Sequence, residues 1–261
     1  MNPIEQFKIE CVKEIEAQGN DKALQAATME WLRRQGANKY IYHFSWLGHP
    51  ILQLPQDTIA LQEIVWSIKP DLIIETGIAH GGSLMMSASL LALLDYCEAV
   101  ATGKILDPKA TRRRVLGIDI DIRAHNRTAI ERHPMADRIH MIQGSSLDPD
   151  IIEKVHLYAR DFSRILVCLD SKHTHVHVLS ELRAYAGLVS EGSYCVVFDT
   201  GIEDMPEGSF PDRPWGKGNS PKTAVWEYLK THPEFEIDRT IHNKLLITAA
   251  HDGYLKRVKA R

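Results

Sequence analysis

The chain has 261 residues, of which 44% are hydrophobic and 25% are charged, as in ordinary folded globular proteins. Its 31 basic and 34 acidic side chains give a formal net charge of −3, so no basic surplus is present to drive binding to nucleic-acid phosphates. No secretory signal is visible at the charged N-terminus, and we find no apolar run approaching the roughly 20 residues that cross a bilayer. We therefore expect a cytoplasmic protein with no membrane and no nucleic-acid partner.

The first 69 residues predict a helical cap followed by a loop. Residues 4–35 have helix-like apolar spacing, whereas the aromatic segment 41–57, with two prolines, predicts an irregular ordered loop. A short helix is expected at about 57–68, ended by Lys69-Pro70. We expect residues 1–69 to form this N-terminal helical cap and substrate-side loop, and residues 70–261 to form the main domain.

From residue 71 the sequence alternates between apolar strand-like runs and helix-like segments. Strands are expected at 71–76, 113–120, 138–144, 164–170 and 193–199. Helices are expected at 83–97, 125–133, 149–160 and 174–187, and a loop at 201–221 is followed by one more helix. Continuous apolar strands between helices indicate a parallel sheet covered on both faces. Two last strands, 235–240 and 244–250 with no helix between them, predict an antiparallel hairpin. This seven-strand α/β layout resembles the Rossmann-like class I methyltransferase fold.

A glycine-rich turn lies between the first of these strands and its helix. It reads Glu75-Thr-Gly-Ile-Ala-His-Gly-Gly-Ser83, which is neither a dinucleotide fingerprint nor a P-loop. Glycines there allow close backbone approach to a ligand, and backbone donors with Glu75 suit the carboxylate and ammonium of an amino-acid-like cofactor. We take Glu75, Gly77, His80 and Ser83 as candidate cofactor contacts. The alternative is a turn that only packs the helix on the strand.

The next two strands end in residues that suit a nucleoside. Asp119 ends the second strand, where nucleoside-binding α/β folds hold ribose hydroxyls, although Asp121 beside it leaves the assignment open. Gly144, Ser145 and Ser146 follow the third strand, and their small side chains let an adenine ring lie against the backbone. Together with the glycine turn, these residues predict binding of S-adenosylmethionine.

Acidic residues and a histidine follow the fourth and fifth strands. Asp170 and Asp199 are expected side by side at the cofactor edge, and two carboxylates there suit a hard divalent cation such as Mg²⁺. His173 lies on the same rim, where an imidazole can take a proton from a hydroxyl nucleophile. The alternatives are a surface histidine or a helix cap. His175 and His177 complete an H-x-H-x-H run, but on a helix the three rings spread over different faces, which disfavours a zinc site.

Five segments of the chain are similar to the cephalosporin hydroxylase family of S-adenosylmethionine-dependent enzymes, which includes rhamnosyl and macrolide-sugar O-methyltransferases. They are FSWLGHPILQLPQD, KPDLIIETGIAHGGS, VLGIDIDIRAHNR, LDSKHTHVHVLSEL and GSYCVVFDT. The resemblance implies that Glu75, Gly77 and Ser83 bind the methionine end of the cofactor, Asp119 its ribose and Ser146 its adenine side. It also implies that Asp170 and Asp199 are metal ligands, with Asp170 beside the cofactor, and that His173 is the general base.

One departure from the family concerns the metal. Relatives commonly have Glu-Asp-Thr after the fifth strand, where this chain has Phe198-Asp199-Thr200. Loss of a carboxylate predicts weaker Mg²⁺ binding, because fewer charged oxygens complete the coordination shell. Phe198 is alternatively a core residue, with Asp199 alone directed into the site.

The leading hypothesis is an O-methyltransferase acting on a hydroxyl of a sugar or natural product, as a homo-oligomer. A hydroxylase-associated protein and a cofactor-binding protein that has lost catalysis are the alternatives. A platform for a sugar ring is a further hypothesis, built from Tyr40, Tyr42, Trp46, Trp215 and the loop 201–220. Arg112-Arg113-Arg114 is more typical of a solvated loop than of a nucleic-acid site. Four separated cysteines with no CxxC pair predict reduced thiols.

Overall fold

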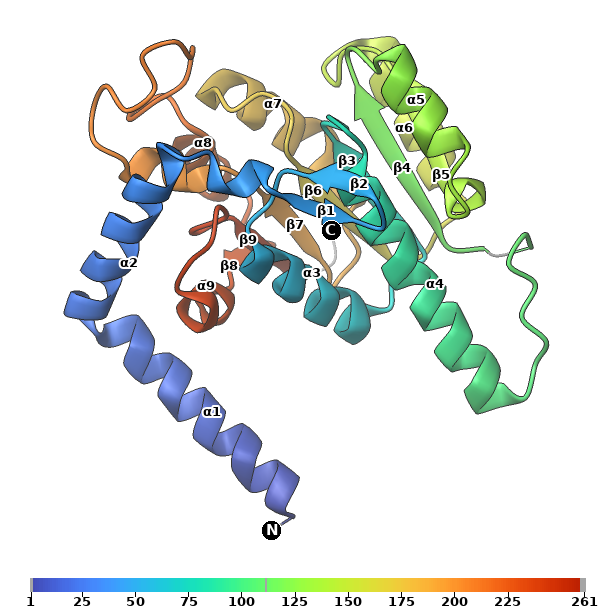
Figure 1. The fold of residues 1–261 in the computed structure, drawn as a ribbon, viewed down its shortest axis with the longest axis horizontal. Helices are drawn as coiled ribbons and strands as arrows, with labels where there is room; N and C mark the ends of the chain where they lie inside the picture. The colour runs from blue at the N-terminus through green and yellow to red at the C-terminus, as the bar shows by residue number, and fades with distance from the viewer. Residues whose placement is uncertain (1, 111, 259–261) are drawn as a thin grey trace.

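The computed structural model describes residues 2–110 and 112–258, and its centre is a seven-stranded sheet (Figure 1). The strand order is β5-β4-β3-β6-β7-β9-β8. The first five strands in this order are parallel, and β9 is antiparallel to both of its neighbours. The strands span Leu72–Thr76 (β3), Arg114–Asp119 (β4), Ile139–Gln143 (β5), Ile165–Leu169 (β6), Tyr194–Val197 (β7), Phe235–Ile237 (β8) and Tyr254–Arg257 (β9). The predicted α/β fold, with its mostly parallel sheet and antiparallel end, is confirmed.

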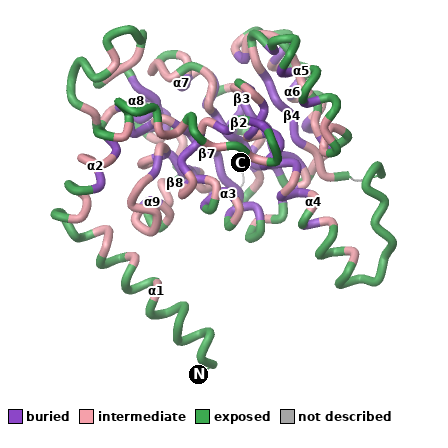
Figure 2. Tube along the Cα trace, in the orientation of Figure 1, coloured by how far each residue is buried: buried purple, intermediate pink, exposed green. Residues whose placement is uncertain are grey.

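Helices cover both faces of this sheet because the central strands carry apolar side chains on both sides. Along β3, Ile73 packs into one apolar cluster and Leu72 and Ile74 into the other, as alternation along a strand requires. The first cluster includes side chains of α3 (Pro55–Ile68), α4 (Gly82–Thr102) and α5 (Ala124–Glu131). The second includes side chains of α6 (Pro149–Ala159), α7 (His175–Tyr185) and α8 (Pro221–Leu229). Figure 2 shows the buried residues gathered along these central strands. Single 3₁₀ turns span Tyr40–Tyr42, Ala136–Arg138, Ala186–Leu188 and Thr200–Asp204.

The helix α4 corrects one statement made from the sequence. Its 21 residues are long and apolar enough to cross a membrane by length and composition. The prediction that no run approaches that length was therefore wrong. In the structure 44% of this window is buried, and Leu84, Met85 and Leu91 of α4 pack in the first apolar cluster. This packing accounts for the apolar composition of α4 as that of a core helix.

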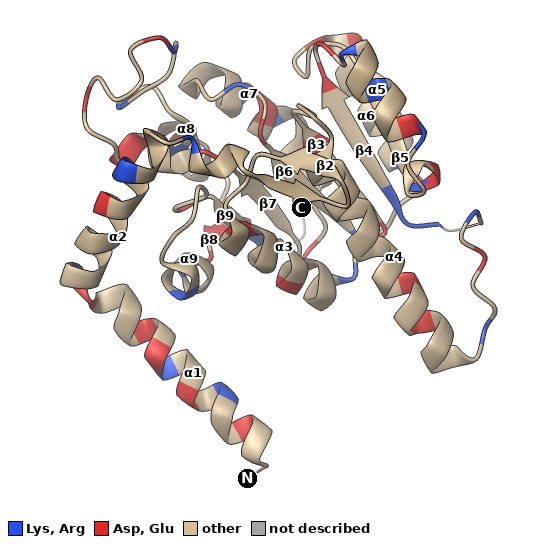
Figure 3. Cartoon of the chain, in the orientation of Figure 1, with Lys and Arg blue, Asp and Glu red and all other residues tan. Residues whose placement is uncertain are grey.

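The predicted helical segment 4–35 forms two helices, α1 (Pro3–Asn20) and α2 (Lys22–Gly36). They meet at Asp21, whose carboxylate accepts the backbone N–H groups of Ala23 and Leu24 and so caps α2. The helix α1 projects from the body of the molecule (Figure 1) and has no buried residue. Acidic and basic residues are interspersed along it (Figure 3). Its exposed apolar side chains include Ile4, Phe7 and Val12.

The segment 41–57 is more regular than predicted. It contains two short antiparallel strands, β1 (Phe44–Trp46) and β2 (His49–Ile51). Leu47 and Gly48 connect them with φ angles of 46° and 88°, the positive values that a two-residue hairpin turn requires. The expectation of an irregular loop was wrong because such a turn is recognised from Asn-Gly or Asp-Gly, and leucine carries no such signal. Trp46 anchors the hairpin on α4 by donating from Nε1 to Ser89 Oγ at 2.9 Å.

The end of the chain also differs from the prediction. The expected strand at 244–250 is wrong. Arg239–Leu245 form a helix, α9, and the closing strand β9 lies further along the chain. The Asp238 side chain caps α9 by accepting from the backbone N–H of Thr240. The loop between them is fixed by a buried carboxylate, since Asp57 accepts hydrogen bonds from Thr248 Oγ1, Ala249 N and Tyr254 Oη. The apolar run predicted as a strand is therefore explained by tertiary packing.

The strand order places the functional edge. From β3 the chain winds outward through β4 to β5, then returns across β3 to add β6 and β7. The order therefore reverses between β3 and β6, and ligands of open α/β sheets bind outside the carboxyl ends of the strands at such a reversal. All the site residues predicted from the sequence follow or end these five strands.

Candidate active site

The turn after β3 lies directly against the end of β6. Gly77 has φ of 91°, and a Cβ atom added there would lie 2.2 Å from the carbonyl oxygen of Asp170. Any side chain would therefore force the two strand ends apart. Gly82 is equally confined, because its Cβ would lie 2.3 Å from the carbonyl oxygen of Pro50. Gly77 thus brings the turn into contact with the loop that carries Asp170, and Gly82 brings the start of α4 against β2.

Asp119 lies at the end of β4, as predicted, and its carboxylate faces the glycine turn. Its Oδ2 accepts the backbone N–H of Ile78 at 2.8 Å and of Ala79 at 3.4 Å. Asn126 of α5 completes the support by donating from Nδ2 to the carbonyl oxygen of Ala79 at 2.8 Å. The neighbouring Asp121 instead has a side chain that is 71% exposed. This geometry favours Asp119 over Asp121 as the acid of the site.

Glu75 is a buried carboxyl below the turn. Its Oε1 accepts a short hydrogen bond from Ser83 Oγ, which joins the end of β3 to the start of α4. Burial raises the pKa of Glu75 from 4.5 to about 7, against the opposing effect of the Ser83 hydrogen bond. Glu75 therefore exchanges a proton close to neutral pH, and a cation placed beside it would favour the ionised form.

The remaining cofactor candidates occupy the rim of this edge. His80 is half-buried, and its carbonyl oxygen lies 3.4 Å from Nδ1 of His49. Ser145 Oγ accepts the backbone N–H of Leu147 and so shapes the loop after β5. Ser146 is buried, with its Oγ 3.3 Å from Nε2 of His177. Their contacts with a cofactor stay predictions.

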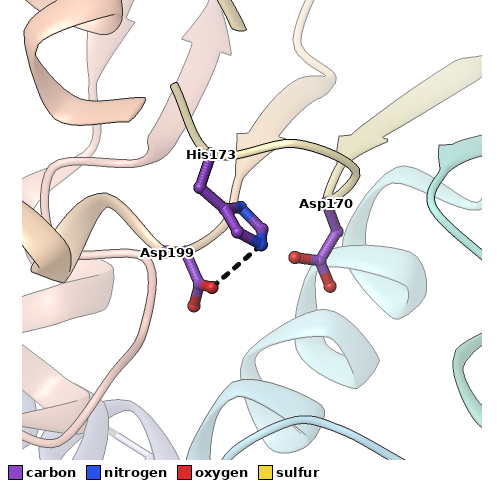
Figure 4. A group of neighbouring side chains, drawn as sticks. All are labelled: Asp170, His173 and Asp199. Carbon is purple, nitrogen blue, oxygen red and sulfur yellow. Dashed lines mark ion pairs between the residues drawn. The ribbon is translucent and has the colours of Figure 1, made fainter. Parts of the chain in front are cut away.

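Asp170, His173 and Asp199 come together as the sequence predicts (Figure 4). One ligand atom from each lies within 4.8 Å of the others, and this is the one such group of metal-ligating side chains that we find among residues 2–110 and 112–258. Nε2 of His173 lies 3.2 Å from Oδ2 of Asp199. The loops after β6 and β7 thus bring together two carboxylates and an imidazole, as their adjacent parallel strands require.

The charge around Asp170 suits a divalent cation. Its pKa is raised well above the ordinary value, first by burial and then by the carboxylates of Asp199, Glu75, Asp57 and Glu181. Such an accumulation of negative charge is relieved either by a proton or by a cation. Asp170 and Asp199 also offer carboxylate oxygens, the ligands that Mg²⁺ prefers. The residues present therefore fit the metal that the sequence predicts.

Phe198 and Asp199 have opposite environments. Phe198 is only 3% exposed and belongs to the first apolar cluster, which confirms it as a core residue. Asp199 has φ of 56°, a left-handed conformation that aspartate tolerates better than most residues. This backbone conformation follows the end of β7 and directs the Asp199 side chain to His173. Position 198 therefore offers no carboxylate to the site, and Asp199 is the acid that directly follows β7.

The three histidines of the H-x-H-x-H run contact different partners. His173 contacts Asp199, whereas His175 contacts Thr223 and Glu227 on α8. His177 contacts serines of two site loops and Glu181 of its own helix. The expected divergence of the three rings is confirmed. The contacts of His177 were missed in the sequence, where its spacing of four residues from Glu181 on one helix was the available signal.

The proposed aromatic platform is only partly assembled. Tyr40 packs edge-on against Trp31 and Phe44, and Trp46 is bonded to α4, so both serve the packing of the cap. Trp215 lies beside the site, with its ring centroid 4.9 Å from that of His173 and nearly perpendicular to it. The loop that carries Trp215 therefore reaches the predicted base.

A cavity of about 650 Å³ lies between α1, α2, α9 and the loop before β9. Its lining includes Met29, His242, Asn243 and Asp252, and none of the site residues predicted from the sequence. Burial lowers the pKa of His242 to about 4, with a further contribution from His251, so this imidazole stays neutral at physiological pH. The cavity is separate in its lining from the Asp170 cluster, and we assign the chemistry to the cluster because it holds the reactive groups.

Three comparisons with known proteins bear on this site. The profile of the Rhamnosyl O-methyltransferase/CmcI family matches residues 38–258. Curated proteins named rhamnosyl O-methyltransferase are similar: one from Mycobacterium tuberculosis is 29% identical over 202 residues, covering 75% of this chain and 71% of the relative. One from Mycobacterium leprae is 27% identical over 219 residues, covering 82% of each.

Solved structures share the fold at lower sequence identity. The structure named "cmcI-D160 Mg-SAM" aligns with a TM-score of 0.54 at 20% identity, covering 84% of this chain and 78% of that one. The structure named "CmcI-N160 apo-structure" aligns with a TM-score of 0.55 at the same identity and coverage. The family profile extends over most of the chain and includes every residue of the site. The chain belongs to the Rhamnosyl O-methyltransferase/CmcI family.

Proposed function

We propose that this protein is an S-adenosylmethionine-dependent O-methyltransferase that methylates a hydroxyl of a sugar or natural product. The observation that carries the proposal is the group Asp170, His173 and Asp199, beside a glycine turn held by Asp119. Turn and group lie at the carboxyl edge of the sheet, on either side of the strand-order reversal. The names of the curated relatives support the reaction and a sugar acceptor.

Each protein group has a defined part in the proposed reaction. The acceptor oxygen attacks the methyl carbon, the bond from that carbon to sulfur breaks, and S-adenosylhomocysteine leaves. His173 takes the proton of the acceptor hydroxyl. The Asp199 carboxylate, 3.2 Å from Nε2 of His173, stabilises the imidazolium that results. The cofactor contributes an activated methyl group, and the protein contributes orientation and proton transfer.

Asp170 and Asp199, with His173 adjacent, would hold Mg²⁺ at this edge. When bound, the ion supplies positive charge that lowers the cost of ionising an acceptor hydroxyl. Relatives with Glu-Asp-Thr have one more acid, so we expect weaker binding here. Support for this ion comes from the acidic surroundings of Asp170 and from a structural neighbour whose name includes Mg-SAM.

The two alternatives are less well supported. Non-haem iron oxygenases use two histidines and one carboxylate, whereas the group described here has one histidine and two carboxylates. A binding protein that has lost catalysis through Phe198 is disfavoured because Phe198 packs in the core and leaves Asp199 at the site.

The proposed function is tested by incubating the chain with S-adenosylmethionine and p-nitrophenyl rhamnoside and detecting the methyl ether by mass spectrometry. Failure to bind S-adenosylhomocysteine in calorimetry would overturn the proposal whatever the acceptor.

Cofactor affinity should depend on Asp119. Replacing it by alanine removes the proposed ribose acceptor and releases the backbone of Ile78 and Ala79. We expect a loss of about 1–3 kcal/mol, or about 5- to 150-fold in affinity for S-adenosylhomocysteine, measured by calorimetry. Asp121→Ala is the matched control, since that acid lies two residues away with an exposed side chain. Equal affinities for the two variants would reject the assignment.

Cofactor binding should also release protons through Glu75. The raised pKa, about 7, leaves this buried carboxyl largely protonated below neutral pH, and an ammonium group bound nearby favours its ionised form. Near pH 6 we expect release of up to about one proton per bound S-adenosylhomocysteine, falling toward zero well above the raised pKa. Titrations in buffers of different ionisation enthalpy measure this number. Glu75→Gln should abolish the release, and its persistence in that variant would assign the proton to another group.

Three expectations from the sequence stay predictions. They are the cytoplasmic location, the division into residues 1–69 and 70–261, and the homo-oligomer. The exposed apolar side chains of α1 offer a surface for such an oligomer.

A further inference from the structure

One face of α7 contacts the loops that follow β5 and β6. His177, Glu181 and Tyr185 are spaced four residues apart, so they lie along the same side of the helix. Nε2 of His177 lies 3.3 Å from Ser146 Oγ and 3.1 Å from Ser171 Oγ. The Tyr185 hydroxyl donates to the backbone carbonyl of Ser146. A single helix thus ties the loop of Ser146 to the loop that begins with Asp170.

Glu181 holds the His177 ring from the next turn of α7. Glu181 is fully buried, its Oε1 accepts from Ser171 Oγ at 2.7 Å, and the same oxygen lies 3.4 Å from Nε2 of His177. The other oxygen, Oε2, is buried with no hydrogen-bond partner among the described residues. Burying a carboxylate is costly unless it is paired, so this acid depends on its contacts with Ser171 and His177.

The groups around Nε2 of His177 determine which of them carry hydrogen. A lone pair on Nε2 of His177 would face the Glu181 carboxylate oxygen, so the tautomer with hydrogen on Nε2 is favoured. Ser171 already donates to Glu181 and has lone pairs left for His177. The single Nε2 hydrogen is then shared between Ser171 Oγ at 3.1 Å and Ser146 Oγ at 3.3 Å, so Ser146 accepts from His177 and its own hydrogen is free for a ligand. His177 therefore sets both the place and the donor role of the Ser146 hydroxyl.

We propose that His177 is a positioning residue that holds the Ser146 and Ser171 loops together for cofactor binding. The inference rests on the proposed function, since it assigns the cofactor to the Ser146 loop. His177 need not touch the reacting atoms, because it acts through Ser146 and through the loop that carries Asp170. His175, two residues earlier on the same helix, gives a matched comparison. It is bonded to Thr223 Oγ1 at 2.8 Å and to Glu227 Oε2 at 3.1 Å, both on α8.

Calorimetry with S-adenosylhomocysteine on the full chain tests the proposal. We expect His177→Ala to weaken binding by about 5- to 30-fold, as the loss of one or two buried hydrogen bonds implies. His177→Gln keeps an amide donor within reach and should stay within about threefold of the natural chain, and His175→Ala within about twofold. Thermal melting of all variants measures their stability. Both alanine variants should have similarly lowered melting temperatures, because each loses a hydrogen-bonded histidine.

The outcomes separate the two proposals. If the natural chain does not bind S-adenosylhomocysteine, the proposed function itself fails. If it binds and His177→Ala retains full affinity, or if His175→Ala weakens binding as much, then the positioning role is wrong. Loss of affinity in His177→Ala that His177→Gln does not restore would assign the effect to packing and would also overturn the inference. His177→Phe replaces the alanine variant if that variant does not fold.

Discussion

Replacing His173 by alanine should lower kcat by about 10²- to 10⁴-fold, the usual contribution of a general base. The loss should fall on kcat because proton removal belongs to the transition state and not to cofactor binding. Affinity for S-adenosylhomocysteine should change little. The structure supports this expectation through the 3.2 Å contact of Nε2 of His173 with Oδ2 of Asp199 and through the Trp215 ring beside it. The measurement is steady-state formation of S-adenosylhomocysteine with p-nitrophenyl rhamnoside as acceptor.

His175→Ala is the control for this prediction, because His175 contacts α8 and not the Asp170 cluster. It should retain the natural rate to within about twofold, as expected for a change outside the site. Turnover of His173→Ala at the natural rate would contradict the assignment, as would a larger loss in His175→Ala. If His173 only served packing, its replacement would lower the melting temperature and spare kcat.

The fold could be predicted where hydrophobic pattern alone decides it. The five parallel strands are continuous apolar runs between helices, and each is found within about two residues of its expected place. The pattern failed where tertiary contacts decide. Residues 244–250 end α9 and begin a loop that Asp57, nearly 200 residues earlier in the sequence, holds through Thr248 and Ala249. The hairpin turn has Leu47 where asparagine or aspartate is usual, so the sequence did not reveal it.

The site was predictable to the extent that strand ends determine it. Asp170 and Asp199 follow adjacent strands, so their proximity needs only the strand order. The support of the glycine turn by Asn126, and the contacts of His177 with two loops, depend on how helices pack against those loops. The four-residue spacing of His177 and Glu181 indicates their own contact, but no local sequence signal specifies how α7 packs against these loops. His177 shows the consequence: its ring was expected to diverge from His173, and it does, yet it points to another part of the same site.

Replacing Asp170 by asparagine should reduce both metal affinity and activity. Burial and the neighbouring Asp199 and Glu75 carboxylates raise the pKa of Asp170 well above its ordinary value. A divalent cation offsets that repulsion, so removal of one of two charged ligands should weaken Mg²⁺ binding by at least about tenfold. Because two carboxylates serve here, binding in the natural chain should already be weak. We therefore expect EDTA to depress activity and Mg²⁺ at roughly millimolar levels to restore it.

The sign of the pH effect follows from the same environment. A raised pKa means that protons compete with the cation for the Asp170 carboxylate, so Mg²⁺ affinity should increase as the pH rises and this proton is lost. Titration calorimetry with Mg²⁺ alone measures this without an acceptor, and Mn²⁺ offers a spectroscopic substitute. Asp121→Asn is the matched control, since it removes one negative charge from an exposed side chain at the same edge of the sheet. If the Asp170→Asn chain binds Mg²⁺ as tightly as Asp121→Asn, and methyl transfer survives EDTA, then the Asp170 cluster is not a metal site. Asp199 would then serve only as the partner of the His173 ring, 3.2 Å from its Nε2.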